Sequence, residues 1–152
     1  FAPDSRRLLI NQGRPDIWDP YTGKRIVSLE AHPLATHFTT FSPKGDRIIS
    51  CMQDGFVFIF NAVTGKTELR ISHPSSHSPF AAVSPNGRIV ATFANDKVAR
   101  IWDAESGSAI DVLEGHTERI TFATFSPDGK WLGTVSDDFT ARLWPVGAIA
   151  RQ

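Results

Sequence analysis

The sequence predicts an all-β protein made of repeated antiparallel sheets, each built from four short strands. Two observations lead to this prediction. Landmark residues recur at a fixed step of 42 residues along the chain. The segments between turn residues alternate apolar and polar side chains with a period of two, which is typical of strands. No segment shows the period of an amphipathic helix over a useful length.

The repeat is visible in three independent sets of residues. The aromatic landmarks, each 42 residues after the one before, are Trp18, Phe60, Trp102 and Trp144. The same step separates Gly23, Gly65 and Gly107, and also Asp54, Asp96 and Asp138. Because separate landmarks share one register, the chain is an internal repeat array. We expect one array over residues 1–152, with units at about 1–40, 41–82, 83–124 and 125–152.

Turn residues mark the strands within each unit. In the last unit, Pro127-Asp128-Gly129 combines a proline that presets φ with a glycine that accepts positive φ, which favours a tight turn. Strands are expected at Trp131–Val135 and Thr140–Trp144. The preceding unit ends with strands expected at Ala109–Leu113 and Ile120–Phe125. The first unit should be the least regular, because Pro15 cannot donate to a strand ladder.

Composition excludes several classes of function. The chain carries 16 basic and 16 acidic residues, so its net charge is zero. This argues against a nucleic-acid protein or a polybasic membrane module, both of which need an excess of Lys and Arg. A single cysteine excludes an internal disulfide and leaves only His and carboxylates for most of a zinc site. No apolar run is long enough for a membrane span, and no signal peptide is recognisable.

Several motifs together resemble those of the WD-repeat (WD40) family. They are Gly115-His116, Phe125-Ser126-Pro127-Asp128-Gly129, Ser136-Asp137-Asp138, and the dipeptides Trp18-Asp19 and Trp102-Asp103. The resemblance covers about three and a half repeats and implies a β-propeller of about four blades. It also implies that the chain is the C-terminal part of a larger propeller. Remaining blades or self-association would then close the ring, because an open array exposes its end sheets.

The resemblance implies a buried structural tetrad in each well-matched repeat. In the last unit its members are His116, Ser136, Asp138 and Trp144. Ser, His and Asp together also suggest a hydrolase, but no nucleophile-elbow motif accompanies them, so we expect a structural role. Ala94, at the place of Ser136, makes the network of the third unit incomplete. The repeat-equivalent structural residues are Trp18, Phe60, Trp102, Asp54, Asp96, His32 and His73.

Other local patterns favour structure over chemistry. Thr64-Gly65-Lys66-Thr67 resembles the end of a phosphate-binding loop but lacks the upstream glycine and lies in a repeat turn. His73 and His77 have a spacing that could chelate a metal on a helix, but the segment is rich in Pro and Ser and should be a loop. Cys51 is expected to be a buried, unreactive thiol. We expect no catalytic residue, metal or cofactor.

The loops at one edge of the blades are the partner surface that the resemblance implies. Its candidates are Arg119, Phe139, Lys97, Phe56, Gln53, Arg14 and His77. Phe139 and Arg119 lead, because aromatic residues and Arg are enriched in binding hot spots. The alternative for Phe139 is packing against a neighbouring blade.

These expectations favour a non-catalytic, cytoplasmic scaffold that presents loops to a protein or peptide partner, without nucleic acid or membrane. This is an argument from family likeness, since fold does not fix function. The alternative is the regulatory propeller portion of a multidomain signalling enzyme, with a kinase, protease or NTPase upstream. A small-ligand or sugar site in the channel or between blades is a third hypothesis.

Overall fold

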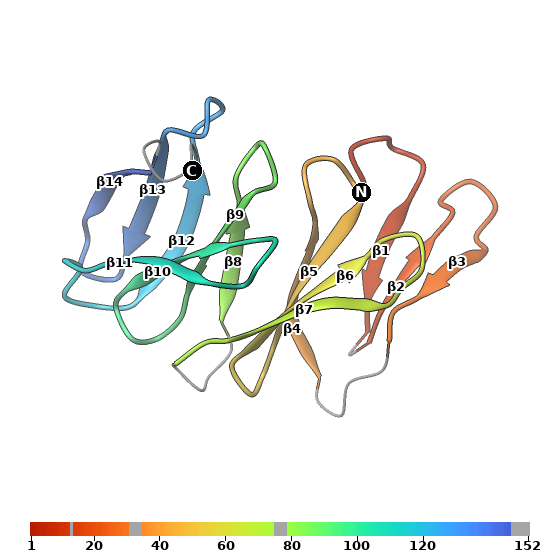
Figure 1. Cartoon of the computed structure of the whole chain (residues 1–152), viewed down its shortest axis with the longest axis horizontal. Helices are drawn as coiled ribbons and strands as arrows, with labels where there is room; N and C mark the ends of the chain where they lie inside the picture. Colours follow the sequence, from red (N-terminus) through yellow and green to blue (C-terminus); the bar gives the residue numbers. More distant parts are fainter. Residues whose placement is uncertain (13, 31–34, 75–78, 147–152) are drawn as a thin grey trace. The chain divides into compact units, whose positions relative to one another are not determined.

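The computed structural model describes residues 1–12, 14–30, 35–74 and 79–146. Every regular element in these residues is a β-strand, and the strands form four antiparallel sheets (Figure 1). Two of the sheets contain four strands and two contain three. The prediction of an all-β chain built from propeller-type antiparallel blades is therefore confirmed.

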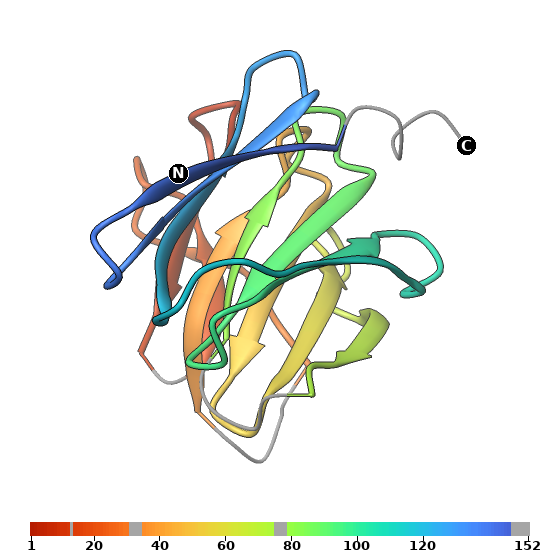
Figure 2. The ribbon, with the colours of Figure 1, turned by 90° about the vertical axis from the view of Figure 1, so that its left-hand side faces the viewer.

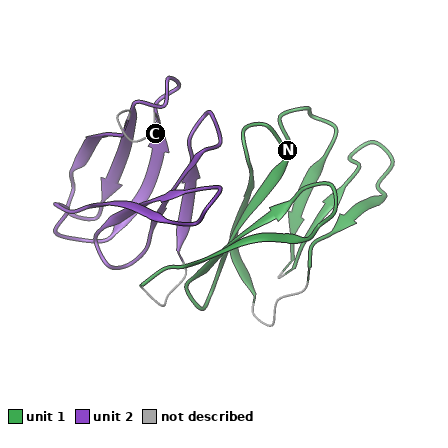
Figure 3. Ribbon diagram, in the orientation of Figure 1, with its two compact units in different colours: residues 1–78 green, residues 79–152 purple. Residues whose placement is uncertain are grey.

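Residues 1–78 form one compact unit with two sheets (Figure 3). The first sheet contains β1 (Leu8–Asn11), β2 (Pro15–Trp18) and β3 (Arg25–Ser28). The second contains β4 (Thr36–Phe41), β5 (Arg47–Met52), β6 (Phe56–Asn61) and β7 (Thr67–Ser72). Strand β2 begins at Pro15 and has four residues, as expected where a proline cannot extend the ladder.

Residues 79–152 form the other compact unit, again with two sheets. The first contains β8 (Phe80–Val83), β9 (Ile89–Phe93), β10 (Ala99–Asp103) and β11 (Ala109–Leu113). The second contains β12 (Ile120–Phe125), β13 (Trp131–Ser136) and β14 (Ala141–Pro145). The strands expected at Ala109–Leu113 and Ile120–Phe125 are found at those residues.

The sheets are offset from the sequence units by one strand. Strands β4, β8 and β12 end at the predicted unit boundaries, yet each pairs with the strand that follows it. Each of these sheets therefore takes its first strand from the end of the preceding sequence unit. Consecutive units are tied together by backbone hydrogen bonds as well as by packing.

Each compact unit holds one apolar core between its two sheets. In residues 1–78 the core includes Ile17, Leu29, Ile48 and Phe60. In residues 79–146 it includes Ile89, Ile101, Leu113 and Leu132, with Trp144 packed against it. The two lists share repeat positions: Ile17 corresponds to Ile101, Leu29 to Leu113, Ile48 to Leu132 and Phe60 to Trp144.

The β6–β7 turn adds a backbone contact between the two sheets of residues 1–78. Gly65 has a φ of +71°, and its carbonyl accepts a hydrogen bond of 2.8 Å from the backbone N–H of Glu30, just after β3. A Cβ atom at Gly65 would lie 2.3 Å from the carbonyl oxygen of Ser28. Glycine is therefore required here both for the left-handed turn and for the close approach of two backbones.

Candidate functional site

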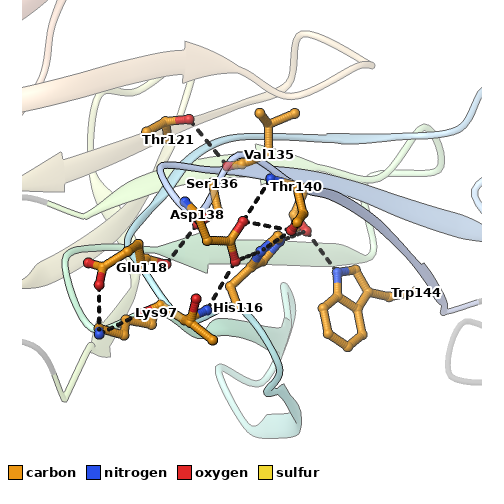
Figure 4. Close-up of polar contacts among 11 residues, drawn as sticks. Lys97, His116, Glu118, Thr121, Val135, Ser136, Asp138, Thr140 and Trp144 are labelled. Atoms are coloured by element: carbon orange, nitrogen blue, oxygen red, sulfur yellow. Dashed lines mark hydrogen bonds and ion pairs between the residues drawn. The ribbon is translucent and has the colours of Figure 1, made fainter.

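A chain of side-chain hydrogen bonds crosses the sheet formed by β12–β14 (Figure 4). His116 lies in the connection between β11 and β12, Thr134 on β13, Asp138 in the β13–β14 turn and Trp144 on β14. The His116 ring lies 2.8 Å from Asp138 through Nδ1 and 2.8 Å from Thr134 Oγ1 through Nε2. The indole Nε1 of Trp144 donates to the same Thr134 oxygen at 2.9 Å.

The chemistry of the groups decides which of them donates and which accepts in this hydrogen-bond network. A carboxylate can only accept, so His116 Nδ1–H donates to Asp138, and in the tautomer with its proton on Nδ1 the ring accepts at Nε2. The hydroxyl of Thr134 can donate to that nitrogen while its oxygen accepts the indole N–H, which can only donate. Each polar group in this hydrogen-bond network therefore has a partner, which is the condition under which such a network stabilises a fold.

Asp138 is the acceptor at the end of the chain. Its Oδ1 accepts from the Thr140 hydroxyl at 2.6 Å and from the Thr140 backbone N–H at 2.8 Å. Its Oδ2 accepts from His116 and, at 3.0 Å, from the backbone N–H of Thr117. The Thr140 hydroxyl, with smaller contributions from His116 and the two amides, holds the pKa of Asp138 far below its ordinary value, although burial opposes this.

The structure corrects one member of the predicted tetrad. The hydroxyl between His116 and Trp144 belongs to Thr134, not to Ser136. Ser136 instead donates to the Glu118 carbonyl at 2.9 Å and accepts from the Asp138 backbone N–H at 3.1 Å. The reason is strand geometry, since residues two apart on one face of a strand are separated by about 6.6 Å, too far for one to replace the other.

The sequence held a signal for Thr134. The residues at the same place in the three later repeats are Ser50, Thr92 and Thr134, all with hydroxyl groups, and all are buried. The places corresponding to Ser136 hold Met52 and Ala94. The repeat position of Thr134, which carries a hydroxyl in three repeats, was therefore a better indicator of the network than Ser136, whose hydroxyl occurs in the last repeat alone among these three.

The third repeat keeps only part of the chain. Trp102 Nε1 donates to Thr92 Oγ1 at 2.7 Å, as Trp144 does to Thr134. Asp96 pairs with Arg100 at 2.5 Å, and its buried Oδ1 has no hydrogen-bond partner. Pro74 stands 42 residues before His116, whereas the predicted His73 is buried directly after β7 and donates its backbone N–H to Gly55.

The remaining repeat-equivalent residues lie in residues 1–78. Phe60 is fully buried, and Trp18 is half-buried beside Leu8 on the neighbouring strand. Asp54 is exposed and accepts from the backbone N–H of Phe56 at 3.2 Å. His32 lies outside the described residues. Cys51 is buried, and burial raises the pKa of its thiol far above the ordinary value.

Phe139 and Lys97 occupy the same place in two consecutive repeats, and both have left-handed backbone. Their φ angles are +63° and +68°, and Gly55 holds this place one repeat earlier with a φ of +87°. The Phe139 side chain is 101% exposed. The alternative that Phe139 packs against a neighbouring blade is therefore wrong for this structure.

Charged residues beside Phe139 are held by ion pairs. Arg119 Nε lies 2.5 Å from the carboxylate of Asp137, and both side chains are largely exposed. Lys97 Nζ donates to the Thr117 carbonyl at 2.5 Å and lies 3.4 Å from the Glu118 carboxylate. Figure 4 shows the Lys97–Glu118 pair beside the hydrogen-bond chain.

The other predicted contact residues lie within residues 1–78 and differ in how exposed they are and in the contacts they make. The Phe56 ring is half-buried, and the guanidinium of Arg70 covers it at 3.6 Å from the ring centroid. Arg14 donates to the Leu29 carbonyl at 3.0 Å. Gln53 is exposed, with its backbone N–H bonded to Ala35. His77 lies outside the described residues.

Comparison with protein families matches residues 23–61, 69–103 and 107–145 to WD40, the WD domain, G-beta repeat. These segments cover most of the chain. The chain belongs to the WD40 family. A search of curated proteins found no significant match. WD40 repeats typically mediate protein–protein interactions, and WD40 domains are generally non-catalytic.

The WD40 hydrogen-bond chain does not form a Ser–His–Asp catalytic relay. Such a relay needs a hydroxyl that is bonded to the His and open to substrate. The hydroxyl at His116 Nε2 belongs to Thr134, which is buried and also bonded to Trp144. The Thr140 hydroxyl lies 3.3 Å from His116 Nδ1 but donates to Asp138 at 2.6 Å. This arrangement can fix the β13–β14 turn.

The described part of this WD40 chain has neither a metal-ligand cluster nor a membrane-spanning helix. No group of three or more His, Cys, Asp or Glu residues there is placed to hold a metal ion. No helix there has the length and apolar character needed to cross a membrane.

Replacing Thr134 by Val should destabilise the chain more than replacing Ser136 by Ala. Valine has almost the same shape as threonine but leaves His116 Nε2 and Trp144 Nε1 without a partner, at a cost of about 2–4 kcal/mol. Loss of the Ser136 hydroxyl should cost about 1 kcal/mol. Urea unfolding measures both values. A larger loss of unfolding free energy from Ser136→Ala than from Thr134→Val would show that the hydrogen-bond network depends on Ser136 instead.

The contribution of Asp138 to stability should vanish in acid. Its pKa is lowered in the folded state, so its contribution is fully present above the ordinary value of 3.8 and is lost as pH falls below it. The free energy of unfolding of the wild type should therefore converge on that of Asp138→Asn as the solution is acidified from neutral pH. If the difference in unfolding free energy between wild type and Asp138→Asn stayed constant from neutral pH to well below 3.8, the assigned hydrogen bonds would be contradicted.

Proposed function

We propose that this WD40 chain is a non-catalytic scaffold that binds a protein or peptide partner through the Phe139 surface. This surface consists of Phe139, Arg119, Asp137, Lys97 and Glu118, all within residues 79–146. In this proposal Phe139 supplies the apolar contact, and the four charged residues supply the polar ones. The family's general role in protein–protein interaction supports this assignment.

The observation that carries the proposal is the conformation and exposure of Phe139. A non-glycine residue in the left-handed region costs roughly 1–2 kcal/mol, and Gly55 shows that the turn can be made by glycine. A fully exposed phenylalanine also leaves a large apolar surface in water. Phe139 therefore costs the fold backbone strain and returns no burial, which points to a role outside the fold.

The surroundings of Phe139 suit a contact site. The β13–β14 turn that carries it is anchored by Asp138, which accepts hydrogen bonds from His116, Thr117 and Thr140. A turn fixed in this way loses little conformational entropy when a partner binds. We assign the Arg119–Asp137 and Lys97–Glu118 pairs as the polar rim of this surface and Phe139 as its aromatic anchor, the usual composition of a binding hot spot.

The charge of this surface favours a protein over a polyanion as partner. Arg119 and Lys97 each face a carboxylate, so the rim has no excess of positive charge. The net charge of the whole chain is also zero. Proteins bind nucleic acids mainly through unpaired Lys and Arg side chains, whereas a protein or peptide partner can pack directly on the aromatic ring.

The test is the binding of peptides selected on the full chain from a random phage-displayed library. Phe139→Gly should weaken the affinity of the selected peptides by at least about tenfold, which is the effect expected of a hot-spot residue. The same change should leave the free energy of unfolding unchanged or raise it by up to about 1 kcal/mol, because it relieves the left-handed strain.

The matched control is Tyr21→Gly, since Tyr21 is an exposed aromatic residue in the β2–β3 turn of the other compact unit. This variant should bind the selected peptides as the wild type does. Peptides that bind Phe139→Gly and wild type equally, or a library that yields no binder, would refute the proposed function. Calorimetric titration gives the affinities.

A further inference from the structure

The outer edge of β7 carries backbone groups that point away from the sheet. Strand β7 is the last strand of its sheet, so within the described residues it pairs with β6 alone (Figure 2, yellow-green strand). The N–H of His73, which follows β7 directly, donates toward β6, to the Gly55 carbonyl at 3.0 Å. Because backbone groups alternate in direction along an antiparallel strand, those of Arg70 and Ser72 point to the other side.

The same positions of β3 are covered by another part of the chain. Ser28 and Glu30 stand 42 residues before Arg70 and Ser72. The Glu30 N–H donates to the Gly65 carbonyl at 2.8 Å. Gly65 also lies so close to Ser28 that a Cβ atom there would be 2.3 Å from the Ser28 carbonyl oxygen. The β6–β7 turn therefore occupies the outer edge of β3.

The same edge of β11 is occupied by a neighbouring side chain. Val112 stands 42 residues after Arg70, and its N–H donates to the carboxylate of Asp111 at 2.8 Å. In β7 the place of Asp111 is held by Leu69, whose side chain cannot accept a hydrogen bond. Within the described residues the N–H groups of Arg70 and Ser72 have no hydrogen-bond partner. An unpaired strand edge of this kind is a template for another strand.

The Arg70 side chain gives this edge a positive charge. Arg70 is exposed, and its guanidinium lies over the Phe56 ring, 3.6 Å from the ring centroid, and 5.8 Å from that of Phe58. Arg47 and Glu68 pair with each other at 2.8 Å, whereas Arg70 forms no ion pair with a described residue. Stacking on the ring restricts the guanidinium, and its planar fork of N–H donors matches a carboxylate.

A strand added at this edge would bring a side chain directly to that guanidinium. Residues opposite each other in a hydrogen-bonded antiparallel pair have Cα atoms about 5.5 Å apart and side chains on the same face. A glutamate or aspartate opposite Arg70 would therefore reach it. The side chains of Leu69 and Ile71 lie on the other face, where apolar residues flanking the acidic one would adjoin them. The edge thus selects an extended segment with an acidic residue between apolar ones.

We propose that the β7 edge binds an extended segment of a protein partner by strand addition, with an acidic side chain of that segment on the Arg70 guanidinium. Backbone hydrogen bonds to Arg70 and Ser72 supply affinity, and the acidic side chain supplies selectivity, which is the usual division in complexes formed by strand addition. This edge shares no residue with the Phe139 surface. The proposal therefore goes beyond the proposed function and stands or falls separately.

The test selects peptides that need the β7 edge. A random phage-displayed library is first depleted on the full chain with Ser72→Pro and then selected on wild type. Proline removes the outward N–H without removing a bond to β6, and edge strands tolerate it at such a position. Peptides for the Phe139 surface bind Ser72→Pro and leave with it, which separates the two tests. The peptides that remain should carry a glutamate or aspartate between apolar residues, and Arg70→Glu should weaken their affinity by at least about tenfold.

Two variants serve as matched controls and should bind these peptides as wild type does. Ser72→Ala keeps the outward N–H, and Lys24→Glu reverses a charge in the exposed β2–β3 turn. Circular dichroism checks that each variant is folded. In wild type, which needs no variant to fold, bound peptide should slow hydrogen exchange of the Arg70 and Ser72 amides by at least about tenfold. The proposal is overturned if no peptide survives the depletion, if Arg70→Glu leaves the affinity intact, or if exchange of the two amides is unchanged.

Discussion

The packing of one sheet upon the next is the interaction on which the other features of this chain depend. A three- or four-stranded sheet with apolar residues on both faces cannot remove them from water alone. In each compact unit an aliphatic–aromatic pair, Ile48 with Phe60 or Leu132 with Trp144, fills the face of the preceding sheet. The repeat is thus a unit of sequence, whereas the unit of stability is a pair of sheets.

The hydrogen-bond chain builds on that packing. Trp144 packs against the core and also donates its N–H to Thr134, so one residue links the apolar contact to the polar network. His116 and Asp138 extend the network to the surface and fix the β13–β14 turn. The exposed Phe139 follows directly on Asp138, so the position of the candidate contact residue is set by the buried core through four side chains.

Much of the fold could be predicted from the sequence because its signals are local. The 42-residue step and the turn residues place strands such as Ala109–Leu113 and Ile120–Phe125 at their observed bounds. The hydroxyl of the network was harder to predict, because Thr134 and Ser136 lie on one face of one strand, and the local motif does not show which of them the Trp144 indole reaches. An open array was expected to expose its end sheets, but the local pattern does not mark the exposed residues, since Trp131 and Leu143 follow the same pattern as the buried Ile89 and Ile101.

Native-state hydrogen exchange tests most directly whether each sheet depends on its neighbour. Leu132 lies on β13, makes no hydrogen bond within β9 or β10, and packs against the sheet that contains them. Leu132→Ala should therefore lower the protection of the β9 and β10 amides together with that of β13, by the same free energy. Unchanged protection in β9 and β10, with loss confined to β13 and β14, would contradict the account.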